Sequence, residues 1–188
     1  MSGDVSIDVG SVIPYYEEKL KAAFGYDTAT RAANDRLVRI QILGAERASS
    51  IQCVGMAGPV PIQQLYQPSR LNPAMTIQEL MSAKRSAILV AGPGRGKTTL
   101  LHWIFVKTFG DETVLPLLFT LRRPSAVGDL VALVNAIKDK TKLKGLRGAL
   151  LLLIDGYDEI EESERIKVSE TLTEFKQQNR GAFLLSCR

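Results

Sequence analysis

The fold of this chain is decided by the stretch Ala87-Ile88-Leu89-Val90-Ala91-Gly92-Pro93-Gly94-Arg95-Gly96-Lys97-Thr98-Thr99. Apolar residues come first, followed by a glycine-rich turn and then by a lysine and two threonines. This order predicts a buried strand that passes through a tight turn into a helix beginning near Lys97. Glycines let the backbone wrap closely around an anion, and the helix N-terminus adds partial positive charge there. The stretch therefore predicts a phosphate-binding loop at the end of a strand.

The loop follows the P-loop pattern G-x-x-x-x-G-K-[ST], except that Ala91 replaces the first glycine. A residue this small should still permit the turn. By this pattern, Lys97 reaches the β- and γ-phosphates of a nucleotide and the Thr98 hydroxyl binds Mg²⁺. The alternative, a loop that only joins a strand to a helix, is disfavoured. The residues expected to cradle the phosphates are Ala91, Gly92, Pro93, Gly94, Arg95, Gly96, Lys97, Thr98 and Thr99.

The composition is that of an ordinary globular protein. The 188 residues are 45% apolar and 23% charged, which allows one substantial domain and a smaller appended segment. The net charge of +4 suits a polyphosphate ligand but is too small to indicate nucleic acid. Cys53 and Cys187 lie too far apart for a C-x-x-C metal pair. No transmembrane segment or signal peptide is recognisable, so we expect a cytoplasmic protein.

The chain divides into three parts by its pattern. Residues 1–49 form a helical N-terminal appendage, with helices expected from Pro14 to Phe24 and from Thr28 to Leu43. Residues 50–85 are expected to be largely extended, with a short strand first and a capping box at Thr76 that opens a short helix. Residues 86–188 alternate between apolar strands and amphipathic helices.

That alternation predicts an α/β fold with a parallel sheet between helical layers, because βαβ units place helices on both faces of a sheet. The strands are expected at residues 87–91, 114–121, 149–155 and 182–186.

A second acidic motif follows the third of these strands. Five apolar residues, 150–154, come directly before Asp155. P-loop enzymes carry a magnesium-binding aspartate at this position. The P-loop and Asp155 would meet, because parallel sheets bind ligands at the carboxyl ends of their strands. Asp158 and Glu159 come next, and either could serve catalysis or cap the following helix. The two roles are balanced for Asp158, whereas for Glu159 we favour a general base.

Here the sequence resembles a known family. Asp155-Gly156-Tyr157-Asp158-Glu159 resembles the Walker B motif of NACHT NTPases. The segment 115–122 resembles the second strand of that family, and 183–188 resembles its sensor-1 strand. Residues 52–66 resemble the segment that often precedes a NACHT domain. The resemblance covers residues 50–188, so 86–188 would be part of the NTPase domain.

The resemblance implies a STAND-class signalling ATPase, which holds ADP when closed and assembles when ATP replaces it. Relatives serve innate immunity or defence against phage. Asp155 would serve Mg²⁺, Glu159 would be the base, and Arg188 would be the sensor-1 residue near the γ-phosphate. The family sheet has the order 5-1-4-3-2. With the fifth strand and the lid absent from this sequence, we expect an incomplete switch with little or no hydrolysis.

The same reasoning predicts that the P-loop strand is an unpaired edge. Protein partners or self-association would use that edge or the N-terminal helices. Two other functions stay open: a small-molecule P-loop kinase with residues 138–147 as a lid, and an interaction fragment with a vestigial nucleotide site. Four further side chains are expected at the surface: Arg95, His102, Arg122 and Arg123.

Overall fold

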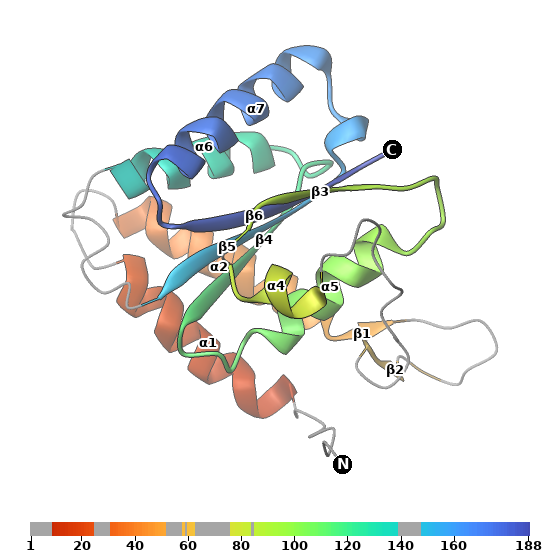
Figure 1. The fold of residues 1–188 in the computed structure, drawn as a ribbon. Helices are drawn as coiled ribbons and strands as arrows, with labels where there is room; N and C mark the ends of the chain where they lie inside the picture. Colours follow the sequence, from red (N-terminus) through yellow and green to blue (C-terminus); the bar gives the residue numbers. More distant parts are fainter. Residues whose placement is uncertain are drawn as a thin grey trace.

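A computed structural model gives the fold of this chain (Figure 1) and describes residues 9–24, 31–51, 58, 60–62, 76–83, 85–138 and 148–188. The helices are α1 (Val9–Phe24), α2 (Arg31–Ala48), α4 (Ile77–Met81), α5 (Lys97–Lys107), α6 (Ala126–Lys138) and α7 (Glu162–Gln177), with a 3₁₀ turn, η1, at Tyr157–Glu159. The strands are β1 (Ser50–Ile51), β2 (Val60–Pro61), β3 (Ala87–Val90), β4 (Val114–Thr120), β5 (Ala149–Asp155) and β6 (Gly181–Cys187).

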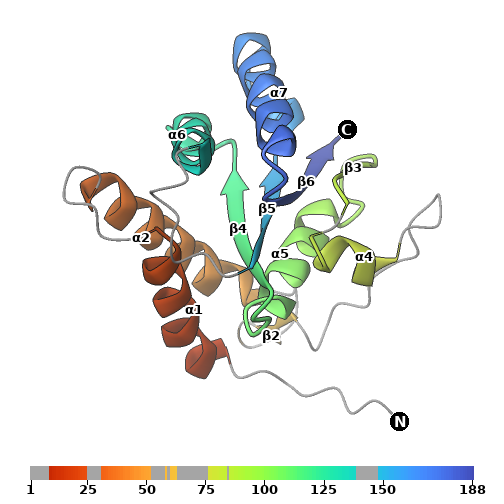
Figure 2. The same cartoon turned by 60° about the vertical axis from the view of Figure 1, so that its left-hand side comes forward.

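The main sheet has four parallel strands in the order β3-β6-β5-β4. Helices α6 and α7 lie on one face of this sheet, and α5 lies on the other with α2 beside it (Figures 1 and 2). The predicted α/β class with a helix-flanked parallel sheet is therefore confirmed. Numbered along residues 86–188, the described strands stand in the order 1-4-3-2. No described strand lies beside β3 on its outer side.

Two short strands and one short helix lie between α2 and β3 in the described part of the sequence. Strands β1 and β2 form a separate antiparallel pair, and α4 carries the predicted capping box, in which Thr76 and Glu79 bond reciprocally. Most of the expected extended segment between β1 and α4 lies outside the described residues.

Two predicted helix boundaries are wrong. Helix α1 begins at Val9, so Pro14 lies inside it rather than at its first position. Pro14 is the sixth residue of α1 and has no N–H to donate to the Gly10 carbonyl, so the helix continues through it with that intrahelical bond missing. Helix α2 continues past Leu43 to Ala48 because Ala45 and Ala48 extend its buried face.

The N-terminal helices close one edge of the sheet. The Tyr16 hydroxyl donates to the Pro116 carbonyl at 2.6 Å, and the Gln41 side chain bonds the backbone of Leu118. Pro116 has no N–H, which suits an edge strand such as β4. Tyr16 also stacks on Phe109 with a centroid distance of 4.7 Å. Helices α1 and α2 thus share one apolar core with the sheet.

The opposite edge is open among the described residues. On β3, the side chains of Ile88 and Val90 are 59% and 70% exposed, whereas Leu89 packs partly against the core. None of the described helices is both long and apolar enough to cross a membrane.

Candidate functional site

The loop between β3 and α5 has the backbone that its glycines predict. Gly94 and Gly96 adopt positive φ angles of 70° and 76°, a region that favours glycine. Helix α5 then begins at Lys97, as expected. The Lys97 ammonium turns back over the loop and donates to the carbonyls of Ala91 at 2.5 Å and Gly92 at 3.1 Å. Lys97, at the end of the loop, therefore bonds the two residues at its beginning.

A cavity of about 310 Å³ lies in front of this loop, at the carboxyl ends of the strands. Seven of the nine predicted cradle residues line it, but Ala91 and Gly92 do not, because their carbonyls face Lys97. Arg95 is exposed, as expected, and also lines the cavity. The complete lining is Pro93, Gly94, Arg95, Gly96, Lys97, Thr98, Thr99, Arg122, Asp155, Gly156, Asp158, Glu159, Ser186 and Arg188.

The two predicted metal ligands meet at this cavity. The Thr98 hydroxyl donates to Asp155 Oδ2 at 2.8 Å, although the residues are 57 positions apart in the sequence. Asp155 is only 3% exposed, and its other oxygen accepts a bond of 2.5 Å from the Ser186 hydroxyl. The Gly156 N–H donates in turn to Ser186 Oγ at 3.3 Å. A buried carboxylate is thus held by two hydroxyl groups.

The residues that follow Asp155 bring more charge to the cavity. Arg188 Nε contacts Asp158 at 2.8 Å, and Arg188 Nη2 lies 3.7 Å from Glu159. Asp158 and Glu159 belong to η1, and the next helix, α7, has Glu161 as its N-cap. The alternative in which these two acids cap that helix is therefore wrong. The predicted sensor residue Arg188 instead pairs with both acids.

Arg122 is exposed, as expected, but its guanidinium also contacts two acids of the site. Its Nε lies 3.1 Å from Glu159 and its Nη2 lies 3.4 Å from Asp155. The reason is the register of β4 on β5, which aligns Thr120 with Asp155 and so carries Arg122 alongside the acidic turn. Arg123, in contrast, is less exposed than expected, and its Nη2 lies 3.9 Å from Asp129.

Sequence reasoning missed two functional candidates, Arg122 and Ser186. A usable signal existed for Ser186, since it stands at the carboxyl end of β6, and β6 pairs with both β3 and β5. Side chains at the carboxyl ends of neighbouring parallel strands gather at one edge. Arg122 gave no comparable signal, because a charged residue after a strand is common at any surface.

The donor set is suited to a metal that arrives with phosphate. Among the described residues, no group of three or more His, Cys, Asp or Glu side chains could hold a metal ion. Nucleotide-bound Mg²⁺ needs only one or two protein oxygens, because phosphates and water complete its shell. Thr98 and Asp155 supply two such oxygens.

His102 is half-buried on α5 rather than at the helix surface, so that expectation is wrong. Burial lowers the pKa of His102, while the nearby Asp155 carboxylate raises it in part.

Of the segment 138–147, which the kinase alternative would use as a lid, the structure describes Lys138 alone. Lys138 ends α6 and pairs with Glu174 at 2.7 Å, and residues 139–147 lie outside the described residues.

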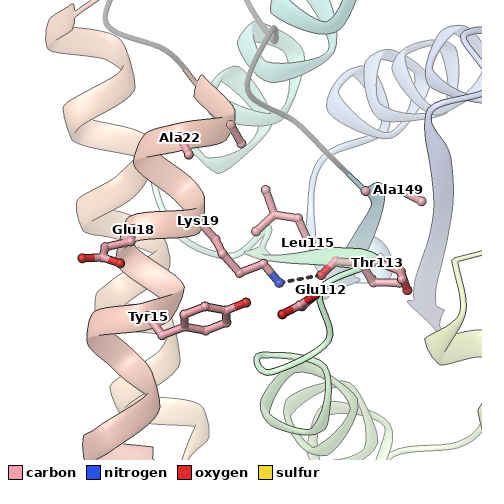
Figure 3. Close-up of a pocket in the computed structure, with 11 residues that line it drawn as sticks. Tyr15, Glu18, Lys19, Ala22, Glu112, Thr113, Leu115 and Ala149 are labelled. Carbon is pink, nitrogen blue, oxygen red and sulfur yellow. Dashed lines mark hydrogen bonds between the residues drawn. The ribbon is translucent and has the colours of Figure 1, made fainter.

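A second, larger cavity of about 890 Å³ lies at the other end of the sheet, beside the amino ends of β4 and β5 (Figure 3). Lys19 reaches into it from α1 and donates to the carbonyls of Asp111 at 2.5 Å and Val114 at 3.0 Å. Burial lowers the pKa of Lys19, and Asp111 and Glu112 partly oppose this effect. The ammonium is engaged in anchoring α1, far from the glycine-rich loop.

No family model matches this chain, and neither a curated protein nor a solved structure matches it.

Proposed function

We propose that this chain binds ATP or ADP together with Mg²⁺ in the cavity in front of the glycine-rich loop. The observation that carries the proposal is the 2.8 Å contact between Thr98 and Asp155, which joins the start of α5 to the end of β5. In a parallel sheet, this is the edge at which ligands bind. A hydroxyl and a carboxylate at that place are the oxygens that nucleotide-bound Mg²⁺ takes from a P-loop protein.

The phosphates would occupy the mouth of the loop. Left-handed glycines before a helix turn backbone N–H groups toward one point, and the N-terminus of the 11-residue α5 adds partial positive charge there. The Lys97 ammonium now bonds two neutral carbonyls, and a phosphate is a stronger partner for it. We expect Lys97 to exchange these carbonyls for phosphate oxygens when nucleotide binds.

Bound Mg²⁺ would neutralise phosphate charge and orient the terminal phosphate. Thr98 and Asp155 would hold it, and their present hydrogen bond would open to admit it. Ser186 keeps Asp155 in place through its second oxygen, so one carboxylate oxygen stays directed at the cavity.

We further propose a regulatory role rather than rapid turnover. Arginines lie beside both carboxylate oxygens of Glu159, at 3.1 and 3.7 Å, so an attacking water would share these oxygens with two guanidinium groups. The resemblance of residues 155–159 to NACHT proteins favours a nucleotide-controlled signalling module of the STAND class, in innate immunity or phage defence. A cytoplasmic location and protein partners belong to the same proposal.

The test is nucleotide binding by the wild type and by Lys97→Ala. Fluorescent ADP and ATP analogues are titrated with Mg²⁺, and GTP is added as a competitor. Lys176→Ala is the matched control, because Lys176 is exposed on α7 and remote from the cavity. We expect Lys97→Ala to weaken binding about tenfold or more, as loss of a charge-assisted contact does, and Lys176→Ala to bind like the wild type.

Equal binding by the wild type and Lys97→Ala would reject the proposed site and favour an interaction fragment. Transfer of the γ-phosphate to a metabolite rather than to water would favour the kinase alternative.

A further inference from the structure

Arg122 makes an unusual bridge within the site. Its single guanidinium contacts Asp155 Oδ2 at 3.4 Å through Nη2 and Glu159 Oε2 at 3.1 Å through Nε. The two acids stand at opposite ends of the short turn that follows β5. Arg122 thus connects the end of the strand to the end of the turn.

Gly156 lies next to this bridge, at a position that favours glycine through its backbone rather than through lack of space. A Cβ atom at Gly156 would lie 3.5 Å from Arg122 Cγ and 3.7 Å from its Nε. The φ angle of Gly156 is +84°, which side chains rarely adopt. The left-handed turn at Gly156 therefore passes close beside the Arg122 side chain.

The oxygen that Arg122 contacts is also the one that a cation needs. Asp155 Oδ1 accepts from Ser186, whereas Oδ2 faces both the Thr98 hydroxyl and Arg122. A cation held between Thr98 and Asp155 would bind Oδ2. Because positive groups this close together repel, the guanidinium and the cation compete for one carboxylate oxygen.

We propose that Arg122 is a positioning residue that ties Asp155 to Glu159, and that a divalent cation displaces it from Asp155. This inference rests on the proposed function, since it takes Thr98 and Asp155 as the metal ligands. One guanidinium makes both contacts, so entry of the cation also changes what holds Glu159. Metal binding and release of the prospective base are thereby coupled.

The test uses Mn²⁺ alone as the probe, without nucleotide, and measures free Mn²⁺ by electron paramagnetic resonance. Arg122 is half-exposed, so its ion pair is of the modest kind found near surfaces. We expect Arg122→Gln to bind Mn²⁺ about three- to fivefold more tightly than the wild type. Asp155→Asn combined with Arg122→Gln should abolish this gain, and Asp155→Asn alone should bind Mn²⁺ more weakly than the wild type.

Arg123→Gln is the matched control. It removes the same charge from the next residue, which lies near Asp129 and does not contact Asp155. We expect its Mn²⁺ affinity to stay near that of the wild type. Arg122→Lys keeps the charge but lacks the planar fork that spans the two acids, so it should fall between the wild type and Arg122→Gln. Thermal melts establish that each variant is folded.

Three outcomes would overturn the inference: an Mn²⁺ affinity of Arg122→Gln equal to that of the wild type, a weaker or undetectable affinity, or an equal gain in Arg123→Gln. None of these depends on nucleotide. If Arg122→Gln gains Mn²⁺ affinity while the wild type binds no nucleotide, the proposed function fails and the role of Arg122 stands.

Discussion

The Gln41 side chain pairs with both backbone groups of Leu118: its Nε2 donates to the Leu118 carbonyl at 3.1 Å, and its Oε1 accepts from the Leu118 N–H at 2.7 Å. These are the two bonds that a neighbouring strand would make with β4. Helix α2 thereby closes one edge of the sheet, and the described part of β3 forms the other edge. The N-terminal helices are thus structural partners of the sheet that carries the site.

Replacing Gln41 with leucine should strongly destabilise the protein. Gln41 is fully buried, so the variant leaves a buried N–H and a buried carbonyl of Leu118 without partners. We expect a loss of about 2–4 kcal/mol in the free energy of unfolding, measured by urea denaturation. Gln177→Leu, at an exposed position of α7, should change it by about 0.5 kcal/mol or less. Similar losses in both variants would show that the pairing of Gln41 with Leu118 adds nothing to the free energy of unfolding.

Replacing Tyr16 with phenylalanine tests the hydrogen bond from Tyr16 to the Pro116 carbonyl and the pH dependence of stability that Tyr16 causes. Below pH 10, we expect a loss of about 1 kcal/mol, because the bond to Pro116 disappears while the ring packing remains. Burial raises the pKa of Tyr16 well above 10.0. Above that pH, the unfolded chain therefore loses the Tyr16 proton while the folded chain retains it, and stability falls.

The readout for Tyr16 is stability against pH, from pH 8 upward, for the wild type and the variant. The stability of the wild type should fall more steeply above about pH 10 than that of Tyr16→Phe, which lacks the titrating group. Parallel curves would contradict the assignment.

Two glycines in one loop provide a matched pair. An added Cβ would meet nothing within 4 Å at either Gly92 or Gly94, but only Gly94 has a left-handed φ, of +70°. We expect Gly94→Ala to cost about 1 kcal/mol in stability through backbone strain and to weaken nucleotide binding. Gly92→Ala should change both quantities much less. Calorimetry and nucleotide titration measure the two effects, and equal behaviour of the variants would reject this account of the loop.

Glu159→Gln separates binding from hydrolysis. We expect the wild type to turn over ATP more slowly than about 1 s⁻¹, the lower end of the range typical of enzymes. If Glu159 is the base, the variant should bind ATP but hydrolyse it about 10²-fold more slowly still. Phosphate release is the measurement, with Glu162→Gln as the control because Glu162 is exposed in the first turn of α7. Unchanged hydrolysis in Glu159→Gln would remove it from the catalytic role.

Much of the site could be predicted from local sequence. An apolar run, a glycine turn and a lysine specify β3, the loop and the start of α5, because each signal acts within a few residues. The run that ends in Asp155 likewise predicted a buried strand with a carboxylate at its end. The meeting of Thr98 with Asp155 followed from the general rule for parallel sheets.

The identity of the charge partners could not be predicted in the same way. Arg122 looks like any polar residue after a strand, and only the register of β4 on β5 places it against Asp155. Gln41 looks like a surface residue on a polar helix, yet it is fully buried because its partner lies 77 residues away. The sequence by itself determined the glycine-rich loop and the strand that ends in Asp155, since these depend on local pattern. Tertiary structure alone decided which arginines neutralise the acids and what closes the sheet, since these depend on distant segments meeting.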